Sequence, residues 1–283
     1  MKLKNSNSVF FVPDGVSDEE ALNRTTHLAI SAHQDDIELM AYKGVAECFG
    51  LKDKWFTGVV VTDGAGSPRN GLYESYTDDD MKNIRILEQK KAAYVGEYSA
   101  QLLLGYTSKQ VKDGKNEEVI KELEQIILKA NPKIIYTHNL ADKHDTHCGV
   151  AVKVIKAVRN LPKDKRPEKI YGCEVWRDLD WVCDEEKIYF DTSEHPNIAM
   201  SLVSVFDSQI IGGKRYDLAA EGRRVANATY SASHGLDSTT ALNYAMDLTP
   251  LIEDSSLDLT DYITGYIDRF KKDVADRLTK VSK

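Results

Sequence analysis

Ala32-His33-Gln34-Asp35-Asp36-Ile37-Glu38 lies between two segments of different periodicity. The apolar run Leu28-Ala29-Ile30 precedes it, and apolar residues at helical spacing follow it as far as Phe49. This order predicts a short buried strand that is followed directly by a helix. The motif places one imidazole and three carboxylates at that junction, and a divalent metal site with its own base requires such groups. A complete site needs at least one further ligand from elsewhere in the chain.

The segments after this motif continue the alternation of strand and helix. Short apolar or β-branched runs predict strands at 26–31, 57–62, 101–104 and 133–137, and apolar residues at three- and four-residue steps predict helices at 78–98 and 117–130. Such alternation is typical of βαβ units, whose crossovers place helices on both faces of a parallel sheet. We therefore expect an α/β fold with a Rossmann-like, mostly parallel sheet.

The second half of the chain has a different pattern. Strands are expected at 169–176, 187–192 and 244–251, and helices at 196–206, 215–232 and 261–281. The sequence contains no internal repeat, low-complexity segment or obvious linker. We expect one domain over residues 1–283, with a core at about 26–160 and a C-terminal α+β elaboration at about 161–283.

The loop after the fourth predicted strand supplies the missing ligand. It contains His138, His144 and His147, three of the seven histidines of the chain. Ligands of parallel sheets bind outside the carboxyl ends of the strands, so this loop, the opening motif and the loop at Asp63 should meet at one edge. His144 and His147 stand three residues apart at a helix start, and both can face back toward the strand ends.

These residues can be assigned chemical roles. A catalytic zinc keeps three protein ligands and one open position, and His33, Asp36 and His147 would supply the three. Asp35 could then take a proton from a water molecule on the metal, while His144 stabilises an oxyanion or protonates a leaving group. The reaction is metal-assisted hydrolysis of an acyl bond. Zinc is expected, and iron(II) is the alternative because sites of His and Asp accept both.

At this point the motifs carry a family resemblance. The opening motif resembles the Ala-His-Pro-Asp-Asp-x-Glu motif of the PIG-L/LmbE-like de-N-acetylases, and the tetrapeptide at 144–147 resembles their His-Pro-Asp-His motif. The segment 61–66 looks like the family's Thr-Asp-Gly loop, residues 85–88 look like its Arg-x-x-Glu helix, and Ser208-Gln209 resembles a later Ser-Gln pair. The likeness covers residues 26–160 well and the remainder loosely.

The resemblance implies a function. Members of that family are zinc-dependent hydrolases that remove acetyl groups from N-acetylglucosamine units. It implies zinc on the three ligands named above, with Asp35 as base and His144 as oxyanion or acid partner. It further implies that Arg85 and Asp63 contact sugar hydroxyls.

The sequence also departs from the family pattern. Gln34 replaces the usual proline, and Phe206 stands where many members have histidine. Because the order His-Asp-Thr-His replaces His-Pro-Asp-His, the carboxylate that orients the first histidine has either moved to Asp145 or been lost. Glu38 is interpreted as a residue at the helix start that orients the metal ligands without binding the metal.

Composition excludes several other classes of function. The net charge is −8 and no long Lys/Arg cluster occurs, so a nucleic-acid or anionic-membrane surface is not expected. No apolar run approaches the roughly 18 residues of a membrane span. Four scattered cysteines without a CxxC pair are typical of reduced thiols. We expect a cytoplasmic enzyme with a small amino-sugar substrate, while its oligomeric state stays open.

Alternatives remain at this stage. The same site could hydrolyse another small amide, such as a thiol or amino-acid conjugate, or the chain could bind metal and sugar without catalysis. A dinucleotide-binding oxidoreductase is disfavoured because no GxGxxG motif occurs. Asp63 is interpreted equally well as a turn residue. Trp176, Trp181 and Tyr189 could line a sugar-binding face, but they are interpreted equally well as core residues of the C-terminal part.

Overall fold

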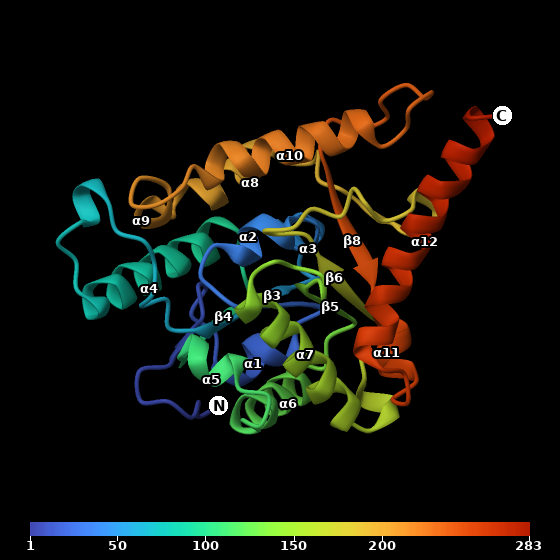
Figure 1. The fold of residues 1–283 in the computed structure, drawn as a ribbon. Coiled ribbons are helices and arrows are strands. Elements are labelled where there is room, and N and C mark those ends of the chain that lie inside the picture. The colour runs from blue at the N-terminus through green and yellow to red at the C-terminus, as the bar shows by residue number, and fades with distance from the viewer.

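Five parallel strands form the centre of an eight-stranded sheet, in the order β4-β3-β2-β5-β6 (Figure 1). The computed structural model describes residues 1–283. All residues of β2 and β3 are buried, as their unbroken apolar runs predict for strands covered on both faces. The Rossmann-like α/β fold is thereby confirmed. The five strands are β2 (His27–Ser31), β3 (Phe56–Thr62), β4 (Ala100–Tyr106), β5 (Ile134–His138) and β6 (Lys169–Cys173).

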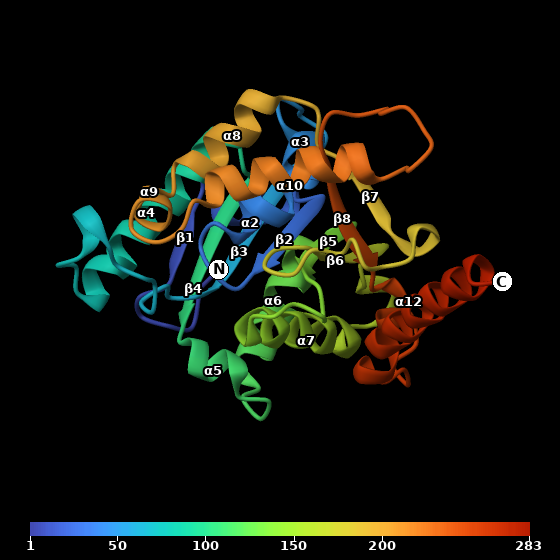
Figure 2. The ribbon, with the colours of Figure 1, turned by 45° about the horizontal axis from the view of Figure 1, so that its top comes forward.

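Three antiparallel strands complete the sheet at its two edges. β1 (Val9–Phe11) pairs with β4, and β8 (Leu242–Asp247) pairs with β6. β7 (Ile188–Asp191) pairs with β8 at the outer edge (Figure 2). The C-terminal half thus extends the sheet that the N-terminal half begins, and this extension is the predicted α+β elaboration.

Helices cover both faces of the sheet. Alternate residues of β2 enter two separate cores, because successive side chains of a strand point to opposite faces. Leu28 and Ile30 belong to one core, Ala29 to the other. The first core is closed by α1 (Asp18–Asn23), α5 (Ser108–Lys112), α6 (Glu118–Ala130), α7 (Asp145–Asn160), α11 (Thr249–Glu253) and part of α12 (Leu259–Val281). The second is closed by α2 (Asp36–Met40), α3 (Tyr42–Cys48), α4 (Asp78–Val95) and α8 (Pro196–Ser204).

The structure differs from the sequence expectation at the last strand. The strand expected at 244–251 ends at Asp247, and α11 begins at Thr249. Oδ1 of Asp247 accepts the N–H of Thr249 at 2.8 Å, and Pro250 has no N–H with which to continue a ladder. Both features turn the chain into a helix. None of the helices combines the length and apolar character that crossing a membrane requires.

Candidate active site

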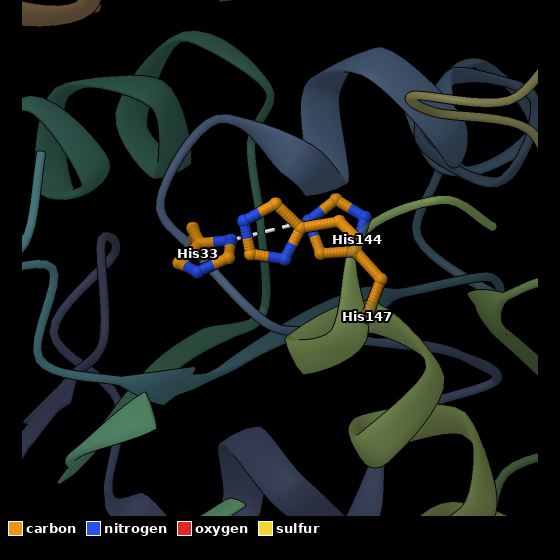
Figure 3. Close-up of side chains that lie close together, drawn as sticks. All are labelled: His33, His144 and His147. Atoms are coloured by element: carbon orange, nitrogen blue, oxygen red, sulfur yellow. Dashed lines mark hydrogen bonds between the residues drawn. The ribbon is translucent and has the colours of Figure 1, made fainter. Parts of the chain in front are cut away.

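The topology brings two distant motifs to one place. His33 and Asp36 follow β2, whereas His144 and His147 lie at the start of α7, which follows β5. β2 and β5 are paired neighbours in the sheet, so their carboxyl ends lie side by side. The imidazoles of His33, His144 and His147 gather where the two loops meet (Figure 3). The convergence expected from the sequence therefore holds for these two loops.

Three donor atoms form a compact triangle at this point. Nδ1 of His33 lies 3.2 Å from Nε2 of His147 and 3.3 Å from Oδ2 of Asp36. Nε2 of His147 lies 3.4 Å from the same carboxylate oxygen. Lone pairs crowded this closely repel one another unless a proton or a cation lies between them. The residues predicted as metal ligands are the three that make this triangle.

The electrostatics of the triangle fit a divalent cation. Burial lowers the pKa of His33, which favours the neutral imidazole that a metal needs. Burial acts to raise the pKa of Asp36, but the neighbouring His147 and His138 imidazoles hold that pKa well below its ordinary value. An ionised carboxylate beside the neutral His33 imidazole supplies donors that zinc accepts. Burial acts to lower the pKa of His147, but Asp36 and Asp142 raise it, so a metal would displace a proton from this imidazole. The residues present therefore fit such an ion.

His138 is close to the triangle but is engaged elsewhere. Its Nε2 lies 3.5 Å from Oδ2 of Asp36, and the same nitrogen accepts the backbone N–H of Ala32 at 2.8 Å. That hydrogen bond occupies its lone pair. The His138 ring instead stacks on His147, with centroids 3.9 Å apart and planes 18° apart. His138 therefore supports a ligand and is not placed to be one.

The geometry of His144 suits a proton donor. It caps α7, and its Nδ1 accepts the backbone N–H of Thr146 at 3.3 Å. A neutral imidazole that accepts at Nδ1 carries its proton on Nε2. Burial lowers the pKa of His144, which favours this neutral form. The ring is half-buried and lines the cavity described below.

Asp142, which the sequence analysis did not single out, lies beside His147. Its Oδ2 lies 3.5 Å from Nδ1 of His147 and accepts the N–H of Trp176, while its Oδ1 accepts the N–H of His144. Asp145, which the sequence suggested as a partner of His144, is the first residue of α7 and is exposed. Its predicted role toward His144 stays a prediction.

Asp35 adopts an unusual backbone conformation. Its φ is 91°, a region that side chains other than glycine rarely occupy. This conformation lets the adjacent carboxylates of Asp35 and Asp36 both line one cavity. Oε1 of Gln89 accepts the N–H of Asp35 at 3.4 Å, and the amide nitrogen of Gln89 donates to Glu38 at 2.8 Å. Glu38, fully buried, thus acts on Asp35 through Gln89 and does not contact the metal ligands.

The environment of Asp35 makes it a stronger base. Burial raises its pKa well above the ordinary value, and the guanidinium of Arg85, whose Nη2 lies 3.6 Å from Oδ1 of Asp35, opposes that rise. Arg85 also donates to the carbonyl of Gln34 and to the hydroxyl of Ser67. It therefore ties the opening motif to the loop after β3.

His33, Asp35, Asp36 and His144 line a cavity of about 450 Å³. Arg85 borders it, and its contact with substrate stays a prediction. Asp63 does not: it borders a separate hollow behind Gln34, accepts the N–H of Ala65 and lies 3.9 Å from the ammonium of Lys82. The reading of Asp63 as a turn residue fits this position. The predicted contact between Asp63 and substrate has no support in the structure.

Further residues of the cavity wall come from the second half of the chain and from α5, for which the sequence analysis assigned no role at the site. The Ser-Gln pair at 208–209, which resembles a pair in the family, indicated one of them. Ser208 donates from its N–H and hydroxyl to Glu88, and Gln209 borders the cavity. Trp181 and Tyr189 lie outside it. The other additional wall residues are Ser108, Lys112, Trp176, Lys214 and Tyr216.

Comparison with known proteins places this geometry in context. Residues 28–158 match the family described as PIG-L, GlcNAc-PI de-N-acetylase. No curated protein matches the sequence significantly. The chain is similar in structure to N,N'-diacetylchitobiose deacetylase from Pyrococcus horikoshii, with a TM-score of 0.63, 16% identity, and 84% of this chain and 88% of that chain covered.

Two further solved structures are similar. The conserved protein TT1542 from Thermus thermophilus has a TM-score of 0.60 and 16% identity, with 82% of this chain and 98% of that chain covered. GalB, the 4-carboxy-2-hydroxymuconate hydratase from Pseudomonas putida, has a TM-score of 0.57 and 14% identity, with 79% of this chain and 95% of that chain covered. At these identities the likeness shows a shared fold.

Proposed function

We propose that this chain, whose residues 28–158 match the PIG-L family of de-N-acetylases, is a zinc-dependent hydrolase that removes the acetyl group from an N-acetylglucosamine-type amino sugar or its conjugate. The observation that carries the proposal is the triangle of His33, Asp36 and His147 donor atoms, 3.2–3.4 Å apart, beside a cavity that His33, Asp36, Asp35 and His144 line. This set supplies ligands, a base and a proton donor in one place.

The three ligands would hold zinc, with iron(II) as the alternative. A divalent ion held there would polarise an acyl oxygen and lower the pKa of a water molecule toward neutrality. Asp35, buried beside this site, would be ionised more readily with the ion bound than burial alone allows. Asp142 and His138 keep the His147 ring in position for this task.

Proton transfer is assigned to Asp35 and His144. The Asp35 carboxylate takes a proton from the attacking water molecule and returns it to the departing amine. Nε2–H of His144 donates to the oxygen that becomes negative as the carbonyl carbon turns tetrahedral. Arg85 keeps the Asp35 carboxylate in place through its contacts with that carboxylate and with Gln34.

A panel of N-acyl amines tests the substrate class. Acetate release is measured for N-acetylglucosamine, its β-glycosides, N-acetylcysteine and N-acetylated amino acids, with zinc-loaded and chelator-treated protein. We expect acetate from the amino sugars alone, and only with metal. Turnover of the amino-acid amides alone would point to another amide substrate. Stoichiometric metal binding without turnover of any compound would point to a binding protein.

A further inference from the structure

A second hollow adjoins the catalytic cavity. It measures about 220 Å³ and lies between the N-terminal half of α10 (Tyr216–Tyr230) and the segment after β6. Leu39, Trp176, Lys214 and Tyr216 border both spaces, so the two hollows are adjacent. Except for Leu39, these shared residues lie outside the part of the chain that matches the family. Most of the wall of the hollow therefore comes from the C-terminal half of the chain.

The inner wall of the hollow is largely apolar. Ala219 and Ala220 of α10 face Val175 and Trp176 across it. The Trp176 ring meets the Tyr216 ring edge to face, with centroids 6.0 Å apart and planes 89° apart, which gives the hollow a flat aromatic side. The one acid at its base, Glu174, already accepts from the N–H groups of Leu179 and Tyr244 and from the amide of Asn227.

The rim of the hollow is positively charged. Arg215 is paired with Asp217 at 2.6 Å, and Arg223 donates to the carbonyl of Val175. Lys214 has no such partner; its ammonium lies 4.4 Å above the Trp176 ring, where the hollow opens into the catalytic cavity. In a chain of net charge −8, an unpaired cation at this junction is available to an acidic group on a ligand.

We propose that this hollow is a second substrate subsite, which takes a flat apolar group, such as an aromatic ring with an acidic substituent, attached to the amino sugar. A dry cavity of about 150 Å³ accommodates a benzene ring, so the space is sufficient. The apolar walls would contact the ring and Lys214 its acidic substituent. This inference rests on the proposed function and narrows its substrate to a glycoside conjugate.

The test compares the kcat/KM values of methyl, phenyl and 4-carboxyphenyl N-acetyl-β-glucosaminides. We expect the phenyl glycoside to exceed the methyl glycoside at least tenfold, and the carboxyphenyl glycoside to exceed both at low salt. Ala219→Phe, which fills the hollow, should bring the phenyl-to-methyl ratio to about one. Lys214→Gln should remove only the advantage of carboxyphenyl over phenyl.

Gly222→Phe is the matched control. It places the same side chain on α10, where an added Cβ meets no atom within 4 Å, and it should keep the wild-type ratio. Trp176→Leu removes the aromatic wall instead of filling the space and should also lower the ratio. The subsite is overturned if the wild type has a phenyl-to-methyl ratio of kcat/KM near one. It is also overturned if both Ala219→Phe and Trp176→Leu keep the full preference for the phenyl glycoside.

A binding measurement separates this inference from the deacetylase proposal. 4-Carboxyphenyl β-glucoside, which has no acetamide, is titrated calorimetrically into the wild type, Ala219→Phe and Gly222→Phe. Binding that only Ala219→Phe loses supports the subsite even if no glycoside releases acetate. Equal binding by all three proteins, or no binding to the wild type, overturns it.

Discussion

Oδ2 of Asp142 lies 3.5 Å from Nδ1 of His147, on the side of the imidazole opposite the nitrogen that faces Asp36. At this distance the two atoms do not form a hydrogen bond, and Nδ1 of His147 has no other partner. We expect the Asp142 carboxylate to accept the Nδ1–H when a metal binds at Nε2, which would fix the ring plane and the tautomer and raise the basicity of Nε2. Asp142 is itself held by the N–H groups of His144 and Trp176.

Asp142→Asn should therefore weaken metal binding. Loss of such an orienting carboxylate typically costs about 10- to 100-fold in metal affinity. The measurement is a zinc titration against a competing chelator. Asp145→Asn, three residues along on the exposed first turn of α7, is the control and should bind zinc as the wild type does. A larger loss of zinc affinity in Asp145→Asn than in Asp142→Asn would contradict this role of Asp142.

Arg85→Lys should lower turnover while the protein keeps its metal. A lysine ammonium cannot reproduce the planar set of donors that reaches Gln34, Ser67 and the vicinity of Asp35. We expect kcat to fall roughly 10- to 1000-fold, the loss that removal of one positioned polar group commonly brings. Steady-state acetate release and zinc content are measured together. Lys82→Gln, on the same helix but outside the cavity, should leave kcat unchanged.

Asp63→Asn tests the position of Asp63 outside the cavity. Because Asp63 borders a different hollow, its amide variant should keep the KM for the amino sugar within about twofold of wild type. Stability should fall by no more than about 1 kcal/mol, since the partly exposed ion pair with Lys82 is weak. A KM raised tenfold or more would place Asp63 at the substrate after all.

The stability of the protein should depend on pH through Glu38. Burial raises the pKa of Glu38 to about 8, although Tyr98 and Gln89 donate to its carboxylate. Between pH 4.5 and 8 the native state then holds a proton that the unfolded state has released. The free energy of unfolding should therefore fall as pH rises through this window, by up to about 1.4 kcal/mol per unit.

Glu38→Gln isolates that contribution. The amide keeps the two incoming hydrogen bonds on its oxygen but does not titrate, so the variant should gain stability relative to wild type as pH rises from about 5 to about 8. Urea unfolding of both proteins across this range gives the difference, in which the other titrating groups cancel. A difference that is independent of pH would mean that Glu38 is ionised in the folded protein.

Much of the active site was predictable because it depends on regular structure. β2 and β5 were recognised from unbroken apolar runs, and parallel strands place the residues after them at one edge. His33 and His147 could therefore be paired across 114 positions of sequence. The same reasoning from parallel strands placed Asp63 at that edge. It could not show that the loop at Gln34 separates Asp63 from the cavity.

Other parts were not predictable because they depend on irregular structure. Asp142 lies beside His147 on a loop whose path no periodicity encodes, and nothing in the sequence distinguishes it from Asp145. Trp176 and Tyr216 meet only after β6, β8 and α10 have packed together. β1 is three residues long and gains its hydrogen bonds from β4 alone, so its sequence carries too little pattern to be recognised.

The most direct test of the central claim is acetate release by Asp35→Asn at known zinc content. Asparagine keeps the shape of the side chain but cannot accept a proton from water, and it leaves His33, Asp36 and His147 intact. We predict a zinc content equal to that of wild type together with loss of nearly all turnover of the amino-sugar substrate. Wild-type acetate release by fully metallated Asp35→Asn would contradict the mechanism.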